Sequence, residues 1–441
     1  MLIVLIWSHT LNNTTPTNCN FTVSDFGQMK QKVLNWAKRY NTFCFLDNHQ
    51  YQLEPHTVEC LLAAGVKRQL TANTGDALEQ LQTFLDAGNS WLFGHLGYDL
   101  KNEIEELSSS NPDKIQFPDL FFFEPEVVIR LSATELVIES DNPHLVYKGI
   151  TEVCAATDEV GPYSFTIQSL ISQKEYISII KKLKQHILRG DCYEINFCQE
   201  FFAENAVIDP FSVYKKLSKV SPNPFSALYK LNDKWLICAS PERFLKRKGP
   251  QILSQPIKGT AKRILNSAAE DQKSKVGLLN SAKDRSENVM VVDLVRNDLA
   301  KICKEGTVKV DELYGIYSFP QVHQMISTVS GILKEEVSFS EIIRATFPMG
   351  SMTGAPKKRV MQFIEQYERT KRGIFSGAIG YISPDGDFDF NVVIRSIMYN
   401  ASSGYLSFEA GSGITYYSDP ELEWEECVLK AEAIKYVLEK I

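Results

Sequence analysis

A lysine held in a constrained stretch of backbone is the first residue of this sequence that could do chemistry. Lys258 lies in the segment PIKGT, two residues after Pro256 and directly before Gly259. Proline fixes its own φ angle and glycine frees the position that follows, so we expect a defined turn at Lys258. Loop lysines are mostly solvated. The segment alone therefore leaves two interpretations open, a surface lysine and a catalytic one.

Two pairs of acidic residues have a spacing that places each pair on one face of a helix. Asp284 and Glu287 are three residues apart, as are Glu423 and Glu426, and Lys430 follows one turn later. Carboxylates from two helices suit Mg²⁺, which keeps several waters and takes few protein ligands. Acidic residues at this spacing usually form a solvated face. A metal site is favoured because the first pair begins an otherwise apolar helix, where unpaired charge is costly.

The helices that would position these residues can be predicted from caps and apolar spacing. The spacing of Ser172 and Glu175 predicts a capping box, and apolar residues recur at helical spacing until Gly190. A second helix is expected over 286–303, and we expect it to be buried because apolar residues lie nearly all round it. The last helix is expected to begin near Pro420.

Strands come in groups with helices between them, without a regular βαβ alternation. This order favours an α+β fold with antiparallel sheets. SGAIGYI and FDFNVVIRSIMY flank SPDGD, which predicts a hairpin. Alternation in the second strand places Phe388, Phe390, Val392 and Ile394 on one face and Asn391 and Arg395 on the other. Gly411 and Gly413, which follow the strand LSFEA, could offer backbone N–H groups to a carboxylate or phosphate.

Composition excludes several classes of protein. The 441 residues suggest two or three structural units, and we divide the chain into 1–165 and 166–441. A net charge of −7 provides no basic field for nucleic acid. The N-terminal run MLIVLIW is too short to span a membrane and lacks the features of a signal peptide. We interpret it as an edge strand or an irregular start of the chain, and we expect a cytoplasmic protein. Nine dispersed cysteines predict reduced core thiols.

The sequence resembles the chorismate-utilising enzymes, which include the component I subunits of anthranilate and aminodeoxychorismate synthases and the isochorismate and salicylate synthases. The resemblance is dense from Ile171 to the C-terminus and thinner before it, in GHLGYDLKNEIE and PDLFFFEP. The matching segments are GDCYEINFCQEF, SPERFL, PIKGT, SAKDRSENVMVVDLVRNDL, FPMGSMTGAPKKR, GAIGY, VIRS, GSGIT and DPELEWEECVLKAEA. It implies a sandwich of two large, mainly antiparallel sheets flanked by helices. Residues 1–165 would contribute to this shared sandwich, and 166–441 would form the chorismate-binding catalytic domain.

The resemblance also implies roles for individual residues. Glu287 and Glu426 would bind Mg²⁺, with Asp284 and Glu423 behind them, and the metal would hold the ring carboxylate of chorismate. Glu242 would be the general acid. The substrate-binding residues would be Thr260, His323, Arg395, Gly411, Gly413 and Lys430. Phe375 stands where tyrosine is commoner, which removes one hydrogen bond to a carboxylate.

Two positions distinguish the branches of this family. Water-adding members carry a lysine where GDCYEINF has Glu194, and ammonia-using members usually carry glutamine there. Anthranilate synthases have PIAGT where this chain and the aminodeoxychorismate synthases have PIKGT. The resemblance is therefore to the branch that aminates chorismate for 4-aminobenzoate and folate synthesis, with Lys258 as the nucleophile. In that role its pKa would have to be lowered, and that of Glu242 raised.

The sequence contains no GxSxG or GxCxG nucleophile elbow, so a second chain would have to release ammonia from glutamine. We expect a glutamine amidotransferase subunit as the partner. Two alternatives remain open, an anthranilate synthase component I and a non-catalytic subunit that activates a glutaminase.

Overall fold

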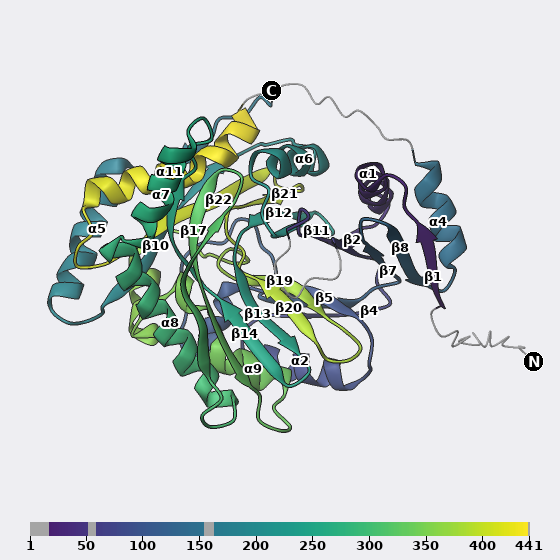
Figure 1. Cartoon of the computed structure of the whole chain (residues 1–441), viewed down its shortest axis with the longest axis horizontal. Helices are drawn as coiled ribbons and strands as arrows, with labels where there is room; N and C mark the ends of the chain where they lie inside the picture. Colours follow the sequence, from purple (N-terminus) through teal and green to yellow (C-terminus); the bar gives the residue numbers. More distant parts are fainter. Residues whose placement is uncertain (1–16, 52–58, 154–162, 440–441) are drawn as a thin grey trace, which may run out of the picture.

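Two large antiparallel sheets form the centre of the molecule, with helices around them (Figure 1). A computed structural model describes residues 17–51, 59–153 and 163–439. The 12-stranded sheet has the order β1 (Thr17–Thr22), β8 (Glu135–Ser140), β7 (Val127–Leu131), β3 (Cys60–Ala64), β2 (Thr42–Asp47), β11 (Phe225–Leu231), β12 (Lys234–Ser240), β21 (Ser396–Asn400), β22 (Tyr405–Ile414), β10 (Glu194–Ala203) and β18 (Gly354–Ala355), with β9 (Gln168–Ser169) on β10. The 10-stranded sheet has the order β15 (Ile257–Lys262), β17 (Val322–Ile332), β14 (Gln251–Gln255), β13 (Arg243–Lys248), β20 (Phe388–Asn391), β19 (Ala378–Ile382), β5 (Leu92–Leu96), β6 (Leu120–Glu124) and β4 (Arg68–Ala72), with β16 (Lys309–Ser318) on β17. The predicted α+β sandwich is confirmed.

The helices lie on the outside of the two sheets (Figure 1). They are α1 (Phe26–Ala37), α2 (Ala77–Asp86), α3 (Lys101–Ile104), α4 (Pro143–Glu152), α5 (Gln173–Leu188), α6 (Pro210–Val220), α7 (Ala268–Leu279), α8 (Ala282–Ile302), α9 (Phe339–Thr346), α10 (Lys357–Tyr367) and α11 (Pro420–Glu439). No described helix combines the length and the apolar character that a membrane span requires. The run MLIVLIW lies outside the described residues.

The apolar core has two parts, one on each face of the 12-stranded sheet. Strand β2 shows the division, because Cys44 belongs to the part between the sheets, whereas Phe43 and Phe45 belong to the part under α1, α5, α6 and α11. The alternation of a strand that is buried on both faces produces this pattern. Strands from the first 140 residues occur in both sheets, so the N-terminal region is part of the sandwich. The division near residue 165 stays a prediction.

Three sequence-based expectations about helices have different outcomes. Helix α11 begins at Pro420 as predicted. Ser172 accepts the backbone N–H of Glu175 at the start of α5, but the Glu175 carboxylate forms an ion pair with Arg369 instead of completing a capping box. Helix α8 was expected to be buried, and this is wrong: Val289 is 43% exposed. The helix contacts β15 and β17 with one face only, which buries Val291 and Leu299.

Two of the points at which the chain crosses between the sheets lie next to each other, and both carry residues of interest. Glu242 lies between β12 and β13, and Arg395 lies between β20 and β21. The Val392 N–H donates to the Glu242 carbonyl at 3.0 Å, which holds the two crossings together. The predicted hairpin is present in β19 and β20, but β20 ends at Asn391. Arg395 therefore does not share a strand face with Asn391; it has a φ of 52°, a rare backbone conformation that often marks functional sites.

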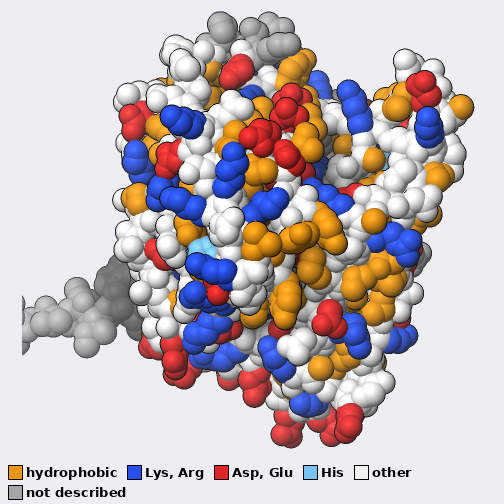
Figure 2. All heavy atoms as spheres, turned by 90° about the vertical axis from the view of Figure 1, so that its left-hand side faces the viewer, with side chains coloured by type: hydrophobic (Ala, Val, Ile, Leu, Met, Phe, Trp, Pro, Cys, Tyr) orange, Lys and Arg blue, Asp and Glu red, His pale blue; other side chains and the backbone are white. Residues whose placement is uncertain are grey.

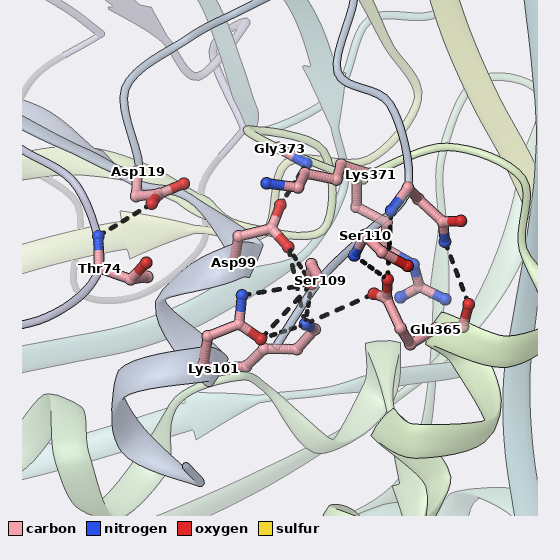
Figure 3. A network of polar contacts seen from close by, with 12 residues as sticks. Thr74, Asp99, Lys101, Ser109, Ser110, Asp119, Glu365, Lys371 and Gly373 are labelled. Atoms are coloured by element: carbon pink, nitrogen blue, oxygen red, sulfur yellow. Dashed lines mark hydrogen bonds and ion pairs between the residues drawn. The ribbon is translucent and has the colours of Figure 1, made fainter. Parts of the chain in front are cut away.

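A network of polar contacts joins the segment after β5 to the C-terminal half of the chain (Figure 3). Asp99 accepts the backbone N–H of Gly373, and Glu365 of α10 accepts the N–H of Ser110 at 2.7 Å. Lys101 is almost fully buried, and its Nζ donates to Ser109. These contacts fix the loop that leads into β19.

Beside this network lies a buried ion pair. The Arg372 guanidinium donates to both carboxylate oxygens of Glu368 and to the carbonyls of Met352 and Asn196. The Glu368 carboxylate also accepts the N–H of Cys198 in β10. The pair thus links the loop before β19 to the 12-stranded sheet.

We predict that Arg372→Met lowers the free energy of unfolding by about 3–5 kcal/mol, because it leaves the buried Glu368 carboxylate without its ionic partner. Arg369→Met is the matched control. It removes the half-exposed pair with Glu175 and should cost less than about 1 kcal/mol. Urea denaturation followed by circular dichroism measures both variants, and equal losses would contradict this assignment.

Candidate active site

A cavity of about 1030 Å³ lies between the two sheets, with α8 and α11 among the elements that line it. The two neighbouring crossings at Glu242 and Arg395 both reach its wall. The predicted site residues that line it are Glu242, Lys258, Thr260, Asp284, Glu287, Arg395, Gly411, Gly413, Glu426 and Lys430. Predicted site residues as far apart in the sequence as Glu242 and Lys430 thus surround one cavity. Phe375 also lines this cavity.

Lys258 lies on a bulged strand, where the sequence had suggested a turn. In the register between β15 and β17, Ile257 faces Ile326 and Thr260 faces Gln324, so one extra residue is accommodated around Lys258. Gly259 has a φ of 97°, as the expected glycine conformation requires. A Cβ at Gly259 would also lie 3.0 Å from the Asp284 side chain. The glycine therefore lets the start of α8 approach the lysine strand closely.

The Lys258 ammonium is buried and forms an ion pair. Its Nζ donates to Oε1 of Glu194, the first residue of β10, at 2.7 Å. Burial lowers the pKa of Lys258, but the attraction of Glu194, Glu287 and Glu242 outweighs burial and raises it. The sequence analysis expected a lowered pKa for Lys258, but the side chains of the protein by themselves raise it. That expectation did not include the contact between the lysine nitrogen and the Glu194 carboxylate.

Glu242 is buried at the sheet crossing and faces the same cavity. Burial raises the pKa of Glu242 to about 7, an increase that Ser351 and the Lys258 ammonium partly oppose. This agrees with the upward direction expected for a general acid.

The acidic pairs of α8 and α11 meet around a lysine that the sequence analysis did not single out. Lys283 Nζ lies 3.1 Å from Glu423, 3.9 Å from Glu287 and 3.9 Å from Glu426. Burial raises the pKa of Glu287 to about 7. At Glu426 burial acts in the same direction, but Lys430 and Lys283 outweigh it and lower the pKa. The Lys283 ammonium therefore lies within 3.9 Å of the carboxylates of Glu287, Glu423 and Glu426.

The donor set fits Mg²⁺, although no complete metal site is preformed. Oε1 of Glu287 and Oε2 of Glu423 are buried and have no hydrogen-bond partner among the described residues. No three His, Cys, Asp or Glu side chains in the described ranges are grouped as a metal site. Mg²⁺ commonly takes one or two carboxylates and completes its shell with water and substrate oxygens. Glu287 and Glu426 could therefore hold it with ligands from the substrate.

The glycines of GSGIT lie in a strand, not in a loop. Gly411 and Gly413 belong to β22, where they face Cys198 and Asn196 of β10. The neighbouring strand β21 pairs only with Tyr405–Ser407, so the other edge of β22 faces no strand at the glycines. The Gly411 carbonyl accepts a hydrogen bond from Lys430 Nζ at 2.9 Å. The two glycines thus line the cavity from a fixed strand.

The structure does not bring His323 to the cavity. Its ring nitrogens lie 2.9 Å from Ser318 and 3.1 Å from Asp271, and the side chain is buried on the other face of β17. Since side chains alternate along a strand, the next residue, Gln324, lines the cavity instead. Neither amide atom of Gln324 has a hydrogen-bond partner among the described residues, and both are buried. His323, which was expected to bind substrate, therefore lies outside the cavity wall, and Gln324 lies in it.

Two features of the site could not have been found by sequence analysis. In the sequence Lys283 is an ordinary helix lysine. Only the arrangement of α8 and α11 shows that it lies among carboxylates of both helices. Gln324 carries no motif, although strand alternation from His323 gave a weak signal. Glu194 was noticed as an unusual residue, but its contact with Lys258, 64 positions away, depends on the register of two different sheets.

Comparison with known proteins agrees with this arrangement. The chorismate binding enzyme family matches residues 34–436. The chain belongs to this family. Among curated relatives, aminodeoxychorismate synthase component 1 of Escherichia coli is 33% identical over 401 residues, which cover 87% of this chain and 86% of the relative. Anthranilate synthase component 1 of Haloferax volcanii is 32% identical over 374 residues, covering 79% and 70%.

Solved structures support the same fold. Anthranilate synthase component I from Streptococcus pneumoniae superposes with a TM-score of 0.75 and 26% identity, covering 88% of this chain and 94% of that one. The isochorismate synthase MenF of Escherichia coli also gives a TM-score of 0.75, at 16% identity with 97% of each chain covered. At that identity the second likeness concerns the fold alone. The relatives with more than 30% identity thus include both aminodeoxychorismate synthase and anthranilate synthase subunits.

We predict that Glu287→Gln and Glu426→Gln each weaken Mg²⁺ binding roughly tenfold or more, since each removes one of the two charges that would hold the ion. Glu425→Gln is the matched control, because Glu425 is exposed on the same helix and does not line the cavity. Isothermal titration calorimetry with MgCl₂ measures the affinity without turnover. Unchanged affinity in both variants would show that these carboxylates do not bind the ion.

We predict that Gln324→Leu raises the KM for chorismate about tenfold, because it removes the buried, unpartnered amide of a residue in the cavity wall. His323→Leu should leave KM unchanged and lower the melting temperature, since it breaks the contacts with Asp271 and Ser318. Steady-state kinetics and thermal unfolding of the two variants separate the effects. The reverse pattern would restore His323 as the substrate-binding residue.

Proposed function

We propose that this chain aminates chorismate to 4-amino-4-deoxychorismate, a precursor of 4-aminobenzoate and folate. The ammonia would come from glutamine through a glutamine amidotransferase subunit, and the reaction would take place in the cytoplasm. The observation that carries the proposal is the buried amine of Lys258 in the wall of the cavity, with Glu242 in the same wall. A primary amine in this position can form a covalent bond to a substrate before ammonia arrives.

The chemistry consists of two displacements at the ring. The neutral Lys258 nitrogen attacks C2 of chorismate, the two ring double bonds shift, and the C4 hydroxyl leaves as water with a proton from Glu242. Ammonia then attacks C4, the double bonds shift back, and Lys258 is released. The enolpyruvyl group stays in place. Because Lys258 lies in a bulged strand, its nitrogen is held near one position, which favours an intramolecular attack.

The remaining residues of the cavity would bind the two carboxylates of the substrate. Arg395 and the backbone of Gly411 and Gly413 would hold the enolpyruvyl carboxylate. Mg²⁺, when bound by Glu287 and Glu426, would neutralise charge next to the ring carboxylate. Lys430, Thr260 and Gln324 complete the polar wall.

Two other functions are favoured less. Anthranilate synthase relatives share the fold and a similar identity, but the resemblance assigns them an alanine at the position of Lys258. A non-catalytic, glutaminase-activating subunit would have no need for Lys258, Glu242, Glu287 and Glu426 around one cavity. Addition of water in place of ammonia is disfavoured by Glu194, where water-adding members have lysine.

We predict that the chain converts chorismate to 4-amino-4-deoxychorismate with ammonium and Mg²⁺, without release of pyruvate. Lys258→Ala should reduce this amination at least 100-fold, because it removes the nucleophile. Lys248→Ala is a matched control, because Lys248 is exposed on β13 of the same sheet and does not line the cavity. Chromatography with mass detection identifies the product. Anthranilate with equimolar pyruvate would contradict the proposal, and so would full activity of the Lys258 variant.

A further inference from the structure

The carboxylate of Glu194 is held in one place by its surroundings. Glu194 is 1% exposed, and its backbone pairs with Ala355 of the short strand β18. A Cβ on Gly354 would lie 2.1 Å from the Glu194 carbonyl oxygen, so this pairing is close. Oε1 accepts the hydrogen bond from Lys258, whereas Oε2 is buried without a hydrogen-bond partner in the described structure. The side chain therefore has one strong contact, and that contact is the lysine nitrogen.

Gly413 keeps the space around this contact free. A Cβ at Gly413 would lie 2.8 Å from Oε1 of Glu194 and 3.1 Å from Nζ of Lys258. The pair thus occupies the volume that any other side chain at this position of β22 would take. Gly413 and Lys258 line the cavity, but Glu194 does not, so Glu194 lies behind the lysine as seen from the substrate.

The other charged groups near Lys258 do not contact its nitrogen. Glu242 at the sheet crossing, Glu287 on α8 and Glu426 on α11 interact with it electrostatically, and Arg395 faces Glu242. Among the described residues, Glu194 is the one carboxylate recorded within 4.0 Å of Nζ. A lysine must lose a proton before it can attack carbon. The shortest path for that proton ends on Glu194.

We infer that Glu194 is the proton acceptor that converts Lys258 to its nucleophilic form, an assignment that rests on the proposed function. The Lys258 ammonium gives one proton to the Glu194 carboxylate, and the neutral amine attacks C2 while Glu242 protonates the departing hydroxyl. Ammonia attacks C4, Lys258 leaves as a neutral amine, and the new C4 ammonium returns a proton to Glu242. Lys258 then recovers its proton from Glu194. The sum is chorismate plus ammonia giving the amine and water, with both glutamates restored.

The test compares the full chain with Glu194→Gln and Glu194→Asp in single turnovers with chorismate, Mg²⁺ and ammonium between pH 6 and 9. The Gln variant keeps the shape of the side chain but cannot accept the proton. Its rate at pH 7 should fall between about 10²- and 10⁴-fold, the usual contribution of a positioned base. In the Gln variant, solvent must remove the proton from Lys258, so the ratio of its rate to that of the unchanged chain should rise about tenfold per pH unit. Because Glu242 titrates in both proteins, its effect on the rate cancels in this ratio. The KM for chorismate should change less than about threefold, because Glu194 does not line the cavity.

Glu194→Asp keeps the carboxylate and should recover a large part of the rate, with a pH dependence like that of the unchanged chain. Three outcomes would overturn the inference: a Gln variant as fast as the unchanged chain, a faster one (which would mean that Glu194 only holds the ammonium), or a loss that does not vary with pH. If the unchanged chain forms no 4-amino-4-deoxychorismate, the proposed function fails and the inference with it. Amination by the unchanged chain together with any of the three outcomes overturns the inference alone.

Discussion

Opposite charges that are buried at the boundary of two sheets set the geometry of this molecule. Lys258 comes from the 10-stranded sheet and Glu194 from the 12-stranded sheet, and their contact at 2.7 Å connects the two. A buried ion pair is costly to form unless its geometry is good and neighbouring groups contribute. The strand register, the bulge in β15 and the absence of a side chain at Gly413 together provide that geometry. Small changes in either sheet would separate the pair.

The same boundary explains why a sandwich of two sheets can build this site. The chain crosses from one sheet to the other at Glu242 and again before Arg395, and residues at a crossing are released from strand alternation. Their side chains can therefore face the space between the sheets. Helices α8 and α11 lie at the side of that space and add the carboxylates around Lys283. On the face shown in Figure 2, basic and acidic side chains are interspersed with hydrophobic ones.

Much of the fold could be predicted from the sequence because its signals are local. The hairpin around SPDGD, the start of α11 at Pro420 and the antiparallel sheets follow from turn residues, caps and alternation. The buried character of α8 was predicted wrongly, since a mixed helix can lie on a sheet with one face and leave Val289 in solvent. The end of β20 at Asn391 was also missed, because no local signal marks a crossing between sheets.

The sequence predicted which residues belong to the site better than it predicted the pKa values of those residues. Resemblance and spacing gave ten residues that line the cavity. Of the other two, Glu423 contacts Lys283 without lining the cavity, and His323 lies on the wrong face of its strand. The pKa of Lys258 was expected to fall, because burial and a nearby Mg²⁺ would both lower it. Contacts between distant residues reversed that direction, and no sequence pattern contains them.

The central claim is that Lys258 forms a covalent bond to chorismate in this cavity. The most direct measurement incubates the chain with chorismate and Mg²⁺ in the absence of ammonia, quenches the reaction with acid, and maps the peptides by mass spectrometry. The account predicts that the peptide with Lys258 gains the mass of chorismate less one water, and that this mass disappears when ammonium is added before the quench. An unmodified Lys258, under conditions in which the chain aminates chorismate, would contradict the account.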